Sequence, residues 1–405
     1  MKHVIIGAGA AGVTASKKIR ELGRDNEIVI VSTDDSIHSR CMLGSYISGE
    51  RDEKGLSFIP DGFFKDANIR WLGGVIVKSV DTDNRHVLFD GGAEAYDRLL
   101  IATGSNNIIP PVKGLREARN VYGLRHLSDA KAIRKNTANM ESVVIIGAGL
   151  VGLNAAYALI AMGKKPVVVE ALDSIIPLNL DKRAAGAYLE RFEQAGCSFH
   201  LGRKVVEASL DESNAVTSIT FDNGERIPCE SVISATSTRP AIDFLANSNV
   251  ACSGGVIVDK YLATNVDGVY AAGDVTGLSG IWPNAMKQGT VAAKNMCGTA
   301  TVFSDSFSAK NTVNFFGLQS LSVGITEPAE DDTVEIREDR NNYEKIILRN
   351  GTVAGIIIQG NISNSGIWQY LVKNKLDVSM IKKPVRKLSF ADFYGVEANG
   401  EYKWS

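Results

Sequence analysis

A short apolar run followed by three regularly spaced glycines constrains the fold of this chain more than any other feature. The run lies near the N-terminus and leads into Gly7, Gly9 and Gly12, with an Ala-rich helical segment behind them. Gly7 permits a tight turn, Gly9 lets a pyrophosphate approach the backbone, and Gly12 lets the helix pack closely on its strand. The anion then meets the N-terminus of that helix. The pattern predicts a dinucleotide-binding site.

The same strand, loop and helix pattern returns with Gly147, Gly149 and Gly152. One such motif is weak evidence, but two complete copies argue against a chance match. The apolar run after the second copy ends at Glu170, eighteen residues beyond Gly152. A carboxylate at that spacing accepts hydrogen bonds from the adenosine ribose and repels a 2′-phosphate, which favours NADH over NADPH. The alternative is that Glu170 is a solvated residue at a strand end.

The length and charge of the chain limit its class. At 405 residues it exceeds a single compact core, so two or three domains are expected. The 44 Lys and Arg residues nearly balance the 46 Asp and Glu residues, for a net charge of -2, which argues against nucleic acid or an anionic membrane as a partner. No apolar run approaches the ~20 residues of a membrane helix. The apolar N-terminus is interpreted as a buried first strand and not as a signal peptide.

The cysteines indicate a reducing compartment. They are widely spaced, with no Cys-x-x-Cys pair and no His-rich segment, which excludes a recognisable zinc site and predicts a cytoplasmic protein. Four of them lie in apolar or strand-like surroundings, where a buried, inert thiol is expected. The five are Cys41, Cys197, Cys229, Cys252 and Cys297. Cys41 has a different, polar setting.

Further strand ends contain residues suited to a cofactor. The second predicted strand covers residues 27–31, and Ser32 follows it at the position where an acidic residue usually holds the adenosine ribose; a serine makes a weaker contact. A later extended segment ends at Gly273 and Asp274. Gly273 lets a cofactor approach the backbone, and Asp274 can accept a hydrogen bond from a ribityl hydroxyl. Pro283 suits the first turn of the helix that follows.

The pattern of apolar and polar residues changes from about Lys310. Alternating apolar and polar residues predict strands, with Asn350-Gly351 as a hairpin turn. A short amphipathic helix is expected over residues 367–373. The tail contains Phe390, Phe393, Tyr394, Tyr402 and Trp404. Such an aromatic module is more typical of packing or a subunit interface than of chemistry.

Four motifs follow one another along the chain in the order found in a known family. They are the two glycine motifs, the run Ala102-Thr103-Gly104 and the segment Thr264–Asp274. The chain resembles the FAD-dependent pyridine nucleotide:disulfide oxidoreductase superfamily over roughly residues 1 to 308. It is most similar to the single-cysteine branch, which includes NADH oxidases, coenzyme A disulfide reductases, rubredoxin reductases and the flavoprotein part of nitrite reductases.

The resemblance implies an α/β fold with two Rossmann-like three-layer dinucleotide-binding domains and a C-terminal α+β domain. Residues 1–110 and 240–308 would form a discontinuous FAD domain, residues 111–239 an inserted NADH domain, and residues 309–405 a dimerisation or interface domain. The implied FAD-binding residues are Gly7, Gly9, Gly12, Ser32, Arg40, Thr103, Gly104, Gly273 and Asp274. The implied NADH-binding residues are Gly147, Gly149, Gly152 and Glu170.

Three positions depart from the family pattern. Asn154 stands where the second glycine motif usually has Glu, and Ser237 stands where the last strand of the NADH domain usually has Gly. Ser32 replaces the usual acid. None of these removes cofactor binding, but each weakens a prediction of rate or affinity.

The electron acceptor depends on the role of Cys41. Disulfide reductases use two cysteines four residues apart, and at that place this chain has only Cys41. Cys41 matches the single redox cysteine of coenzyme A disulfide reductases and NADH oxidases, and a helix N-terminus beside Arg40 would favour its thiolate. The surrounding residues also resemble the Arg-containing segment of rubredoxin reductases, in which case Cys41 is a bystander. His38 is either a base for the thiol or an ordinary loop residue.

The leading hypothesis is an NADH:acceptor oxidoreductase that passes electrons to a small iron-sulfur or rubredoxin-type protein. The enzyme is expected to be a homodimer and to have no nucleic-acid or membrane partner. The runner-up is a Cys41-dependent reductase of disulfides or persulfides, or an NADH oxidase. A third hypothesis is a flavin-binding signalling or scaffold protein.

Overall fold

The computed structural model describes the backbone of residues 1–398 and 401–404, and the side chains up to residue 398 together with that of Glu401. The aromatic side chains of Tyr402 and Trp404 lie outside the described residues. The chain divides into two compact units: the first contains residues 1–147, 151–169 and 203–308, and the second contains residues 148–150, 170–202 and 309–405.

A parallel sheet forms the centre of the first unit. Its strands lie in the order β18-β7-β1-β2-β3, and every neighbouring pair is parallel. Their bounds are β1 Lys2–Ile6, β2 Glu27–Ser32, β3 Arg70–Gly73, β7 Arg98–Ile101 and β18 Val269–Ala271. Ile6 pairs with both Val31 and Ile101, so the carboxyl ends of the central strands meet at one edge of the sheet. The loops that follow these strands are therefore neighbours in space.

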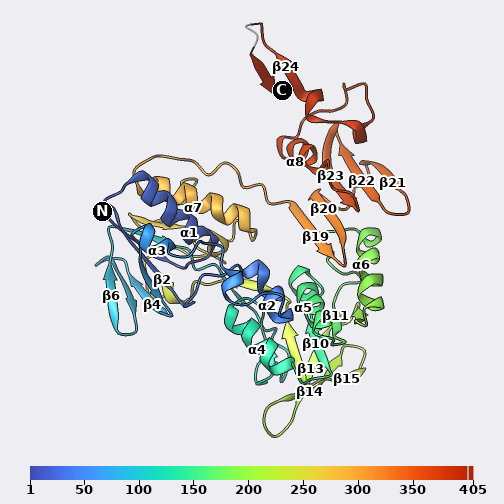
Figure 1. Ribbon diagram of the computed structural model, residues 1–405, viewed down its shortest axis with the longest axis horizontal. Coiled ribbons are helices and arrows are strands. Elements are labelled where there is room, and N and C mark those ends of the chain that lie inside the picture. The colour runs from blue at the N-terminus through green and yellow to red at the C-terminus, as the bar shows by residue number, and fades with distance from the viewer. Residues whose placement is uncertain (399–400, 405) are drawn as a thin grey trace. The chain divides into compact units, whose positions relative to one another are not determined.

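Helices cover one face of this sheet and a small antiparallel sheet covers the other. Helix α1 (Ala10–Leu22) and helix α7 (Trp282–Met296) lie side by side, although most of the chain separates them in sequence (Figure 1). Their apolar residues share a core with Ile5 and Ile30 of the sheet. The opposite face packs on strands β4 (Val77–Asp81) and β5 (His86–Phe89), which pair with β6 (Gly92–Ala95). The short helix α3 spans Phe63–Asp66.

A second parallel arrangement repeats this plan. Strands β11, β10, β16 and β9 lie side by side in that order with parallel pairing. Their bounds are β9 Val121–Tyr122, β10 Val143–Ile146, β11 Val167–Glu170 and β16 Ser231–Ser234. An antiparallel sheet of β13 (Val205–Leu210), β14 (Val216–Phe221) and β15 (Arg226–Pro228) shares a core with β10 and β16. The helices of this part are α4 (Leu127–Thr137) and α5 (Leu150–Ala161).

The chain crosses between the two parallel sheets through a pair of short strands. Strand β8 (Ser105–Asn107) runs antiparallel to β17 (Thr238–Pro240), with Ser105 opposite Pro240. The outgoing and returning segments of the chain are thus hydrogen-bonded to each other. Pro110-Pro111 follows the first crossing.

An antiparallel sheet forms the C-terminal part of the second unit. Its order is β19-β20-β23-β22-β21. The bounds are β19 Lys310–Phe315, β20 Leu318–Gly324, β21 Thr333–Glu338, β22 Tyr343–Arg349 and β23 Thr352–Gln359. The turn between β22 and β23 contains Asn350-Gly351, as expected. Helix α8 (Ser365–Asn374) follows, and β24 (Tyr394–Val396) pairs with β25 (Tyr402–Trp404) at the end.

Helix α6 (Lys182–Gln194) of the same unit packs on this sheet, and strand β12 (Ser198–Leu201) follows it. The buried Tyr188 hydroxyl donates to the hydroxyl of Ser320, 2.9 Å away. Asp181 caps α6 by accepting from the Ala184 N–H, and it also pairs with the buried Lys345 at 3.0 Å. Because Lys345 and Asp181 are both buried, each would be costly to leave unpaired.

The predicted fold class is confirmed: two parallel sheets of α/β type are followed by an antiparallel C-terminal domain. Among the residues that the structure describes, no helix is both long enough and apolar enough to cross a membrane.

His3 is a buried polar residue in β1. It is 0% exposed, and neither ring nitrogen has a hydrogen-bond partner among the described residues. Burial lowers the pKa of His3 from 6.5 to about 4, and the positive chain N-terminus adds to this effect. The unfolded chain therefore takes up the proton more readily than the folded one. This contribution to stability is complete above the unfolded pKa and is lost as the pH falls toward 4.

We predict that replacing His3 with Phe removes part of the acid sensitivity of the protein. Between pH 7 and about pH 4.5, the wild-type chain should lose about 2 kcal/mol of unfolding free energy that His3→Phe retains. Urea unfolding at the two pH values measures this difference. His86→Phe, at a partly exposed position, is the matched control. Equal losses in the wild-type and His3→Phe proteins would contradict the prediction.

Candidate functional site

The first glycine loop leaves β1 at the carboxyl edge of the sheet with no room for side chains. Gly7 has φ 104°, and a Cβ on it would lie 2.3 Å from the Ala102 carbonyl oxygen. A Cβ on Gly12 would lie 2.0 Å from the Gly7 carbonyl oxygen. Both distances are far below any tolerated contact between non-bonded atoms. The turn therefore requires glycine at position 7, and the close packing of α1 on the loop requires glycine at position 12. The backbone of the loop is left open to a ligand.

Two neighbouring cavities lie along this edge. The larger has a volume of about 260 Å³, and its lining includes Gly7, Gly9, Ser32, Asp34, Arg40 and Thr103. The smaller has a volume of about 80 Å³, and its lining includes Gly9, Arg40, Cys41, Gly104, Gly273 and Asp274. Gly9 and Arg40 belong to both. These two cavities are lined by eight of the nine residues predicted for FAD, all except Gly12, although the sequence spreads them over most of the first 274 positions.

Arg40 provides positive charge beside the glycine loop. Its Nη2 lies 3.1 Å from the Asp34 carboxylate, while its Nε is buried without a partner among the described residues. Its Nη1 would lie 3.0 Å from a Cβ placed on Gly9. Burial lowers the pKa of Arg40, and the charge of Asp34 opposes that shift. A buried N–H with no acceptor is costly, so this guanidinium suits an anionic group such as a pyrophosphate.

Arg125 is a site residue that the sequence analysis missed. Its Nη2 donates to the Asp274 carboxylate at 2.6 Å, and its Nε donates to the Ser105 carbonyl at 3.1 Å. It lines the smaller cavity with Cys41. Arg125 lies between the short strand β9 and helix α4, in a stretch without a recognisable motif. No local signal indicates that it meets a residue 149 positions away.

Three other predicted residues have local partners. The Ser32 hydroxyl accepts from the Asp34 N–H at 3.2 Å, and the Thr103 hydroxyl donates to the Ala241 carbonyl at 2.8 Å. His38 is buried, with Nδ1 3.2 Å from the Ser36 carbonyl oxygen and Nε2 without a partner among the described residues. Burial lowers the pKa of His38. A role as base for Cys41 therefore finds no support in the described contacts of His38.

Cys41 lies in a short 3-10 helix, Arg40–Met42, that leads directly into α2 (Leu43–Ser48). Its thiol is exposed at the cavity, yet neighbouring protein atoms desolvate it and raise the pKa of Cys41 above its ordinary value. Arg125 and Arg40 both oppose this shift without reversing it. The sequence led us to expect a stabilised thiolate, whereas the balance of burial and charge favours the protonated thiol.

The second glycine loop has the same tight geometry as the first. A Cβ on Gly147 would lie 2.6 Å from the Ala235 carbonyl oxygen, and one on Gly152 would lie 1.9 Å from the Gly147 carbonyl oxygen. A Cβ on Gly149 would meet nothing within 4 Å, so the space over that residue is open. Within the second unit, the Glu170 carboxylate accepts from the N–H groups of Ala148, at 2.7 Å, and Leu172, at 3.0 Å. Glu170 thus has a fixed, locally hydrogen-bonded orientation.

Comparison with known proteins gives a consistent result. Residues 1–289 match the family model described as pyridine nucleotide-disulphide oxidoreductase. Residues 310–376 match a second model, described as the rubredoxin NAD+ reductase C-terminal domain. Together the two models cover both parallel sheets and the whole five-stranded antiparallel sheet.

Individual relatives are distant but span most of the chain. The epsilon subunit of NADH-dependent phenylglyoxylate dehydrogenase from Aromatoleum evansii is 29% identical over 94% of this chain and 93% of its own length. The rubredoxin-NAD(+) reductase of Pseudomonas putida is 28% identical over 74% of this chain and 81% of its own length. The NAD-dependent persulfide reductase structure from A. fulgidus superimposes with a TM-score of 0.82 and 25% identity, over 93% of this chain and 77% of that one. The chain spans only 48% and 50% of two longer relatives from Bacillus subtilis.

We predict that Gly12→Ala yields a protein largely without flavin. The added methyl group would lie 2.0 Å from the Gly7 carbonyl oxygen and push α1 away from the loop. Flavin affinity should fall by at least roughly ten-fold, equivalent to about 1.4 kcal/mol. The ratio of flavin to protein absorbance after gel filtration measures it. Gly186→Ala is the control, because a Cβ there meets nothing within 4 Å. Full flavin retention by Gly12→Ala would overturn the assignment of this loop.

Proposed function

The chain belongs to the pyridine nucleotide-disulphide oxidoreductase family, and on that basis we propose that it oxidises NADH and passes the electrons to a small iron-sulfur or rubredoxin-type protein. It is an FAD-dependent NAD(P)H oxidoreductase of this family. The observation that supports the finer proposal is the match of residues 310–376 to the C-terminal domain of rubredoxin reductases. The Pseudomonas putida relative has rubredoxin in its name.

We assign the cofactor sites as follows. FAD is held by Gly7, Gly9, Gly12, Ser32, Arg40, Thr103, Gly104, Gly273 and Asp274, with Arg125 added from the structure. NADH is held by Gly147, Gly149, Gly152 and Glu170. The unpartnered Arg40 Nε and the crowded glycine loop fit a bound dinucleotide pyrophosphate. When bound, FAD accepts a hydride from NADH and releases electrons to the acceptor.

The residues of the chain bind the cofactor and fix its orientation. The N–H groups at the start of α1 and the Arg40 guanidinium place positive charge at the loop, where a pyrophosphate needs it. Asp274 has one oxygen 2.6 Å from Arg125, so its position is fixed by a charged hydrogen bond. Pro283 in the first turn of α7 lacks an N–H, which costs nothing at a helix start. These groups hold a ligand in one orientation and carry out no bond chemistry themselves.

The state of Cys41 favours electron transfer over a thiol mechanism. A nucleophilic or redox-active cysteine depends on its thiolate, and burial raises the pKa of this thiol. The runner-up, a reductase of disulfides or persulfides or an NADH oxidase, is supported by the exposure of Cys41 at the cavity that also contains Gly273. The likeness to the persulfide reductase structure points the same way.

The remaining assignments are part of the same proposal. The FAD domain is 1–110 with 240–308, the NADH domain is 111–239, and residues 309–405 serve a homodimer interface. The cytoplasmic location stays a prediction from the cysteine content. A flavin-binding signalling or scaffold protein remains the third hypothesis. Steady-state turnover of about 1 per second or more with any acceptor would exclude it, since that is the low end of ordinary enzymes.

We predict that anaerobic titration with NADH reduces the flavin with two electrons per chain and no more. Cys41→Ser should then leave the titration and dye reduction within about two-fold of wild type, because a thiol that is already reduced accepts no electrons from NADH. Flavin absorbance during the titration measures both. Uptake of about four electrons, or a long-wavelength thiolate-to-flavin band lost in Cys41→Ser, would instead support the thiol reductase.

We predict that Glu170→Gln lowers kcat/KM for NADH by roughly ten-fold, as expected for losing a hydrogen bond to a charged group. The ratio of kcat/KM for NADH to kcat/KM for NADPH should also fall, because the neutral side chain no longer repels a 2′-phosphate. Steady-state dye reduction with both nucleotides measures the ratio. Glu190→Gln on the exposed surface of α6 is the control. An unchanged ratio would remove Glu170 from the nucleotide site.

A further inference from the structure

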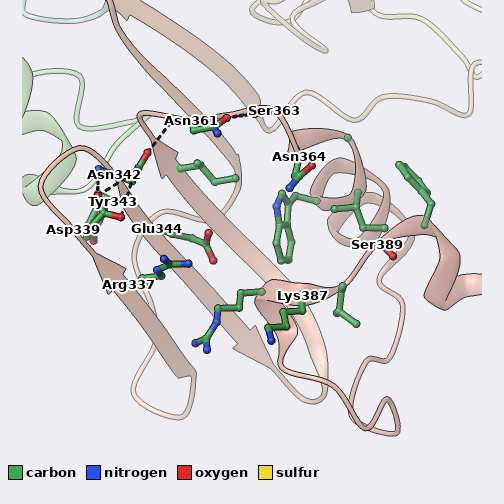
Figure 2. A pocket seen from close by; sticks show the side chains of 17 residues that line it. Arg337, Asp339, Asn342, Tyr343, Glu344, Asn361, Ser363, Asn364, Lys387 and Ser389 are labelled. Atoms are coloured by element: carbon green, nitrogen blue, oxygen red, sulfur yellow. Dashed lines mark hydrogen bonds between the residues drawn. The ribbon is translucent and has the colours of Figure 1, made fainter.

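A second cavity, far larger than those of the flavin site, lies within the C-terminal domain. Its volume is about 740 Å³, in the range of cavities that bind small molecules. It is bounded by the turn between β21 and β22, the loop between β23 and α8, the first turn of α8, and residues 386–390 (Figure 2). No cofactor of the proposed reaction is assigned to it.

Three cationic side chains line this cavity: Arg337, Arg386 and Lys387. Figure 2 shows Arg337 close to Glu344, whereas Lys387 lies farther from it. None of the three cations forms a side-chain hydrogen bond or ion pair with a described residue. Some cationic groups of this unit are paired, as in Arg349 with Asp332 at 2.8 Å. Two carboxylates, Asp339 and Glu344, also line the cavity and interact electrostatically with Arg337. The three cations exceed these two acids by one charge, and a bound anion would balance that excess.

The inner wall of the cavity is apolar and includes an aromatic ring. Trp368 is 3% exposed, and its indole N–H has no hydrogen-bond partner among the described residues. Ile358, Ile367 and Leu388 are also buried in this wall, while Phe390 is 41% exposed at its edge. A simple inorganic anion would leave this surface unused. A ligand with a flat, mostly apolar ring beside its charge would cover it.

Glu344 adds an acceptor to the cavity. It is half-buried, and burial raises the pKa of Glu344 against the opposing charges of Arg337 and Arg386. Its carboxyl group suits a hydroxyl or amino donor of a ligand. The start of α8 also borders the cavity, with Asn364 and Gly366 in the lining. The cavity thus combines cations, an acceptor and an apolar wall.

We propose that this cavity binds a nucleotide. Its phosphate lies among Arg337, Arg386 and Lys387, its base lies against the wall formed by Trp368, and a ribose or amino donor meets Glu344. A nucleotide joins all three features in one molecule of suitable size. This ligand is additional to FAD and NADH, and the inference does not depend on the identity of the electron acceptor.

The test is calorimetric titration of the flavin-loaded protein with AMP, and with inorganic phosphate and adenosine as its fragments. AMP should bind at least about ten-fold more tightly than either fragment, since each fragment uses part of the cavity. Arg337→Gln/Arg386→Gln should weaken AMP binding by a similar factor. Neither arginine forms a hydrogen bond or ion pair with a described residue, and neither is assigned to a cofactor site, so the double variant should stay folded and keep the KM for NADH of the wild type.

Lys375→Asn/Lys382→Gln is the matched control, because it removes the same charge from exposed positions outside the lining. It should bind AMP as the wild type does. Equal AMP affinity in the arginine variant and the wild type would overturn the proposal, and would place any AMP binding at the NADH site. Phosphate binding as tight as that of AMP would overturn the assignment to a nucleotide.

Discussion

The close approach of backbone to backbone at the two glycine loops is the constraint on which the rest of this molecule depends. At Gly12 and Gly152 a single methyl group would lie 2.0 and 1.9 Å from a carbonyl oxygen of the same loop. Because the helices are seated so closely, their first N–H groups open toward the carboxyl edge of each parallel sheet. The remaining residues of the candidate site can contact a ligand only at that edge. Each of them lies at the end of a strand or in a neighbouring loop.

Charge balance is the second organising feature of the flavin site. Arg40 pairs with Asp34, and Arg125 pairs with Asp274, so two cations and two anions surround the smaller and larger cavities. The pairs hold long side chains in fixed positions without giving the region a strong net charge. Cys41 lies beside them, and desolvation outweighs the nearby cations at its thiol. The electrostatic surroundings therefore suit ligand binding better than they suit a reactive thiolate.

Local sequence signals predicted a large part of this structure. The glycine loops, the Asn350-Gly351 turn and the start of α7 at Pro283 each follow from turn and capping chemistry within a few residues. The pairing of Arg125 with Asp274 joins positions 149 residues apart, and no local pattern indicates it. The pKa of Cys41 was misjudged for a related reason. Arg40 is its neighbour in sequence, but burial raises the pKa of the thiol more than the charge of Arg40 lowers it.

The order of strands in the first sheet has a consequence for synthesis. Strand β18 (Val269–Ala271) pairs with β7 (Arg98–Ile101), and α7 completes the layer over α1. A ribosome adds roughly 5–20 residues per second, so the N-terminal strands wait about ten seconds or more for their last partners. During that interval the apolar face of α1 lacks α7 and the sheet lacks one edge. Nascent chains are therefore exposed to aggregation at this stage, and flavin can be captured securely only after residue 289 or so has left the exit tunnel.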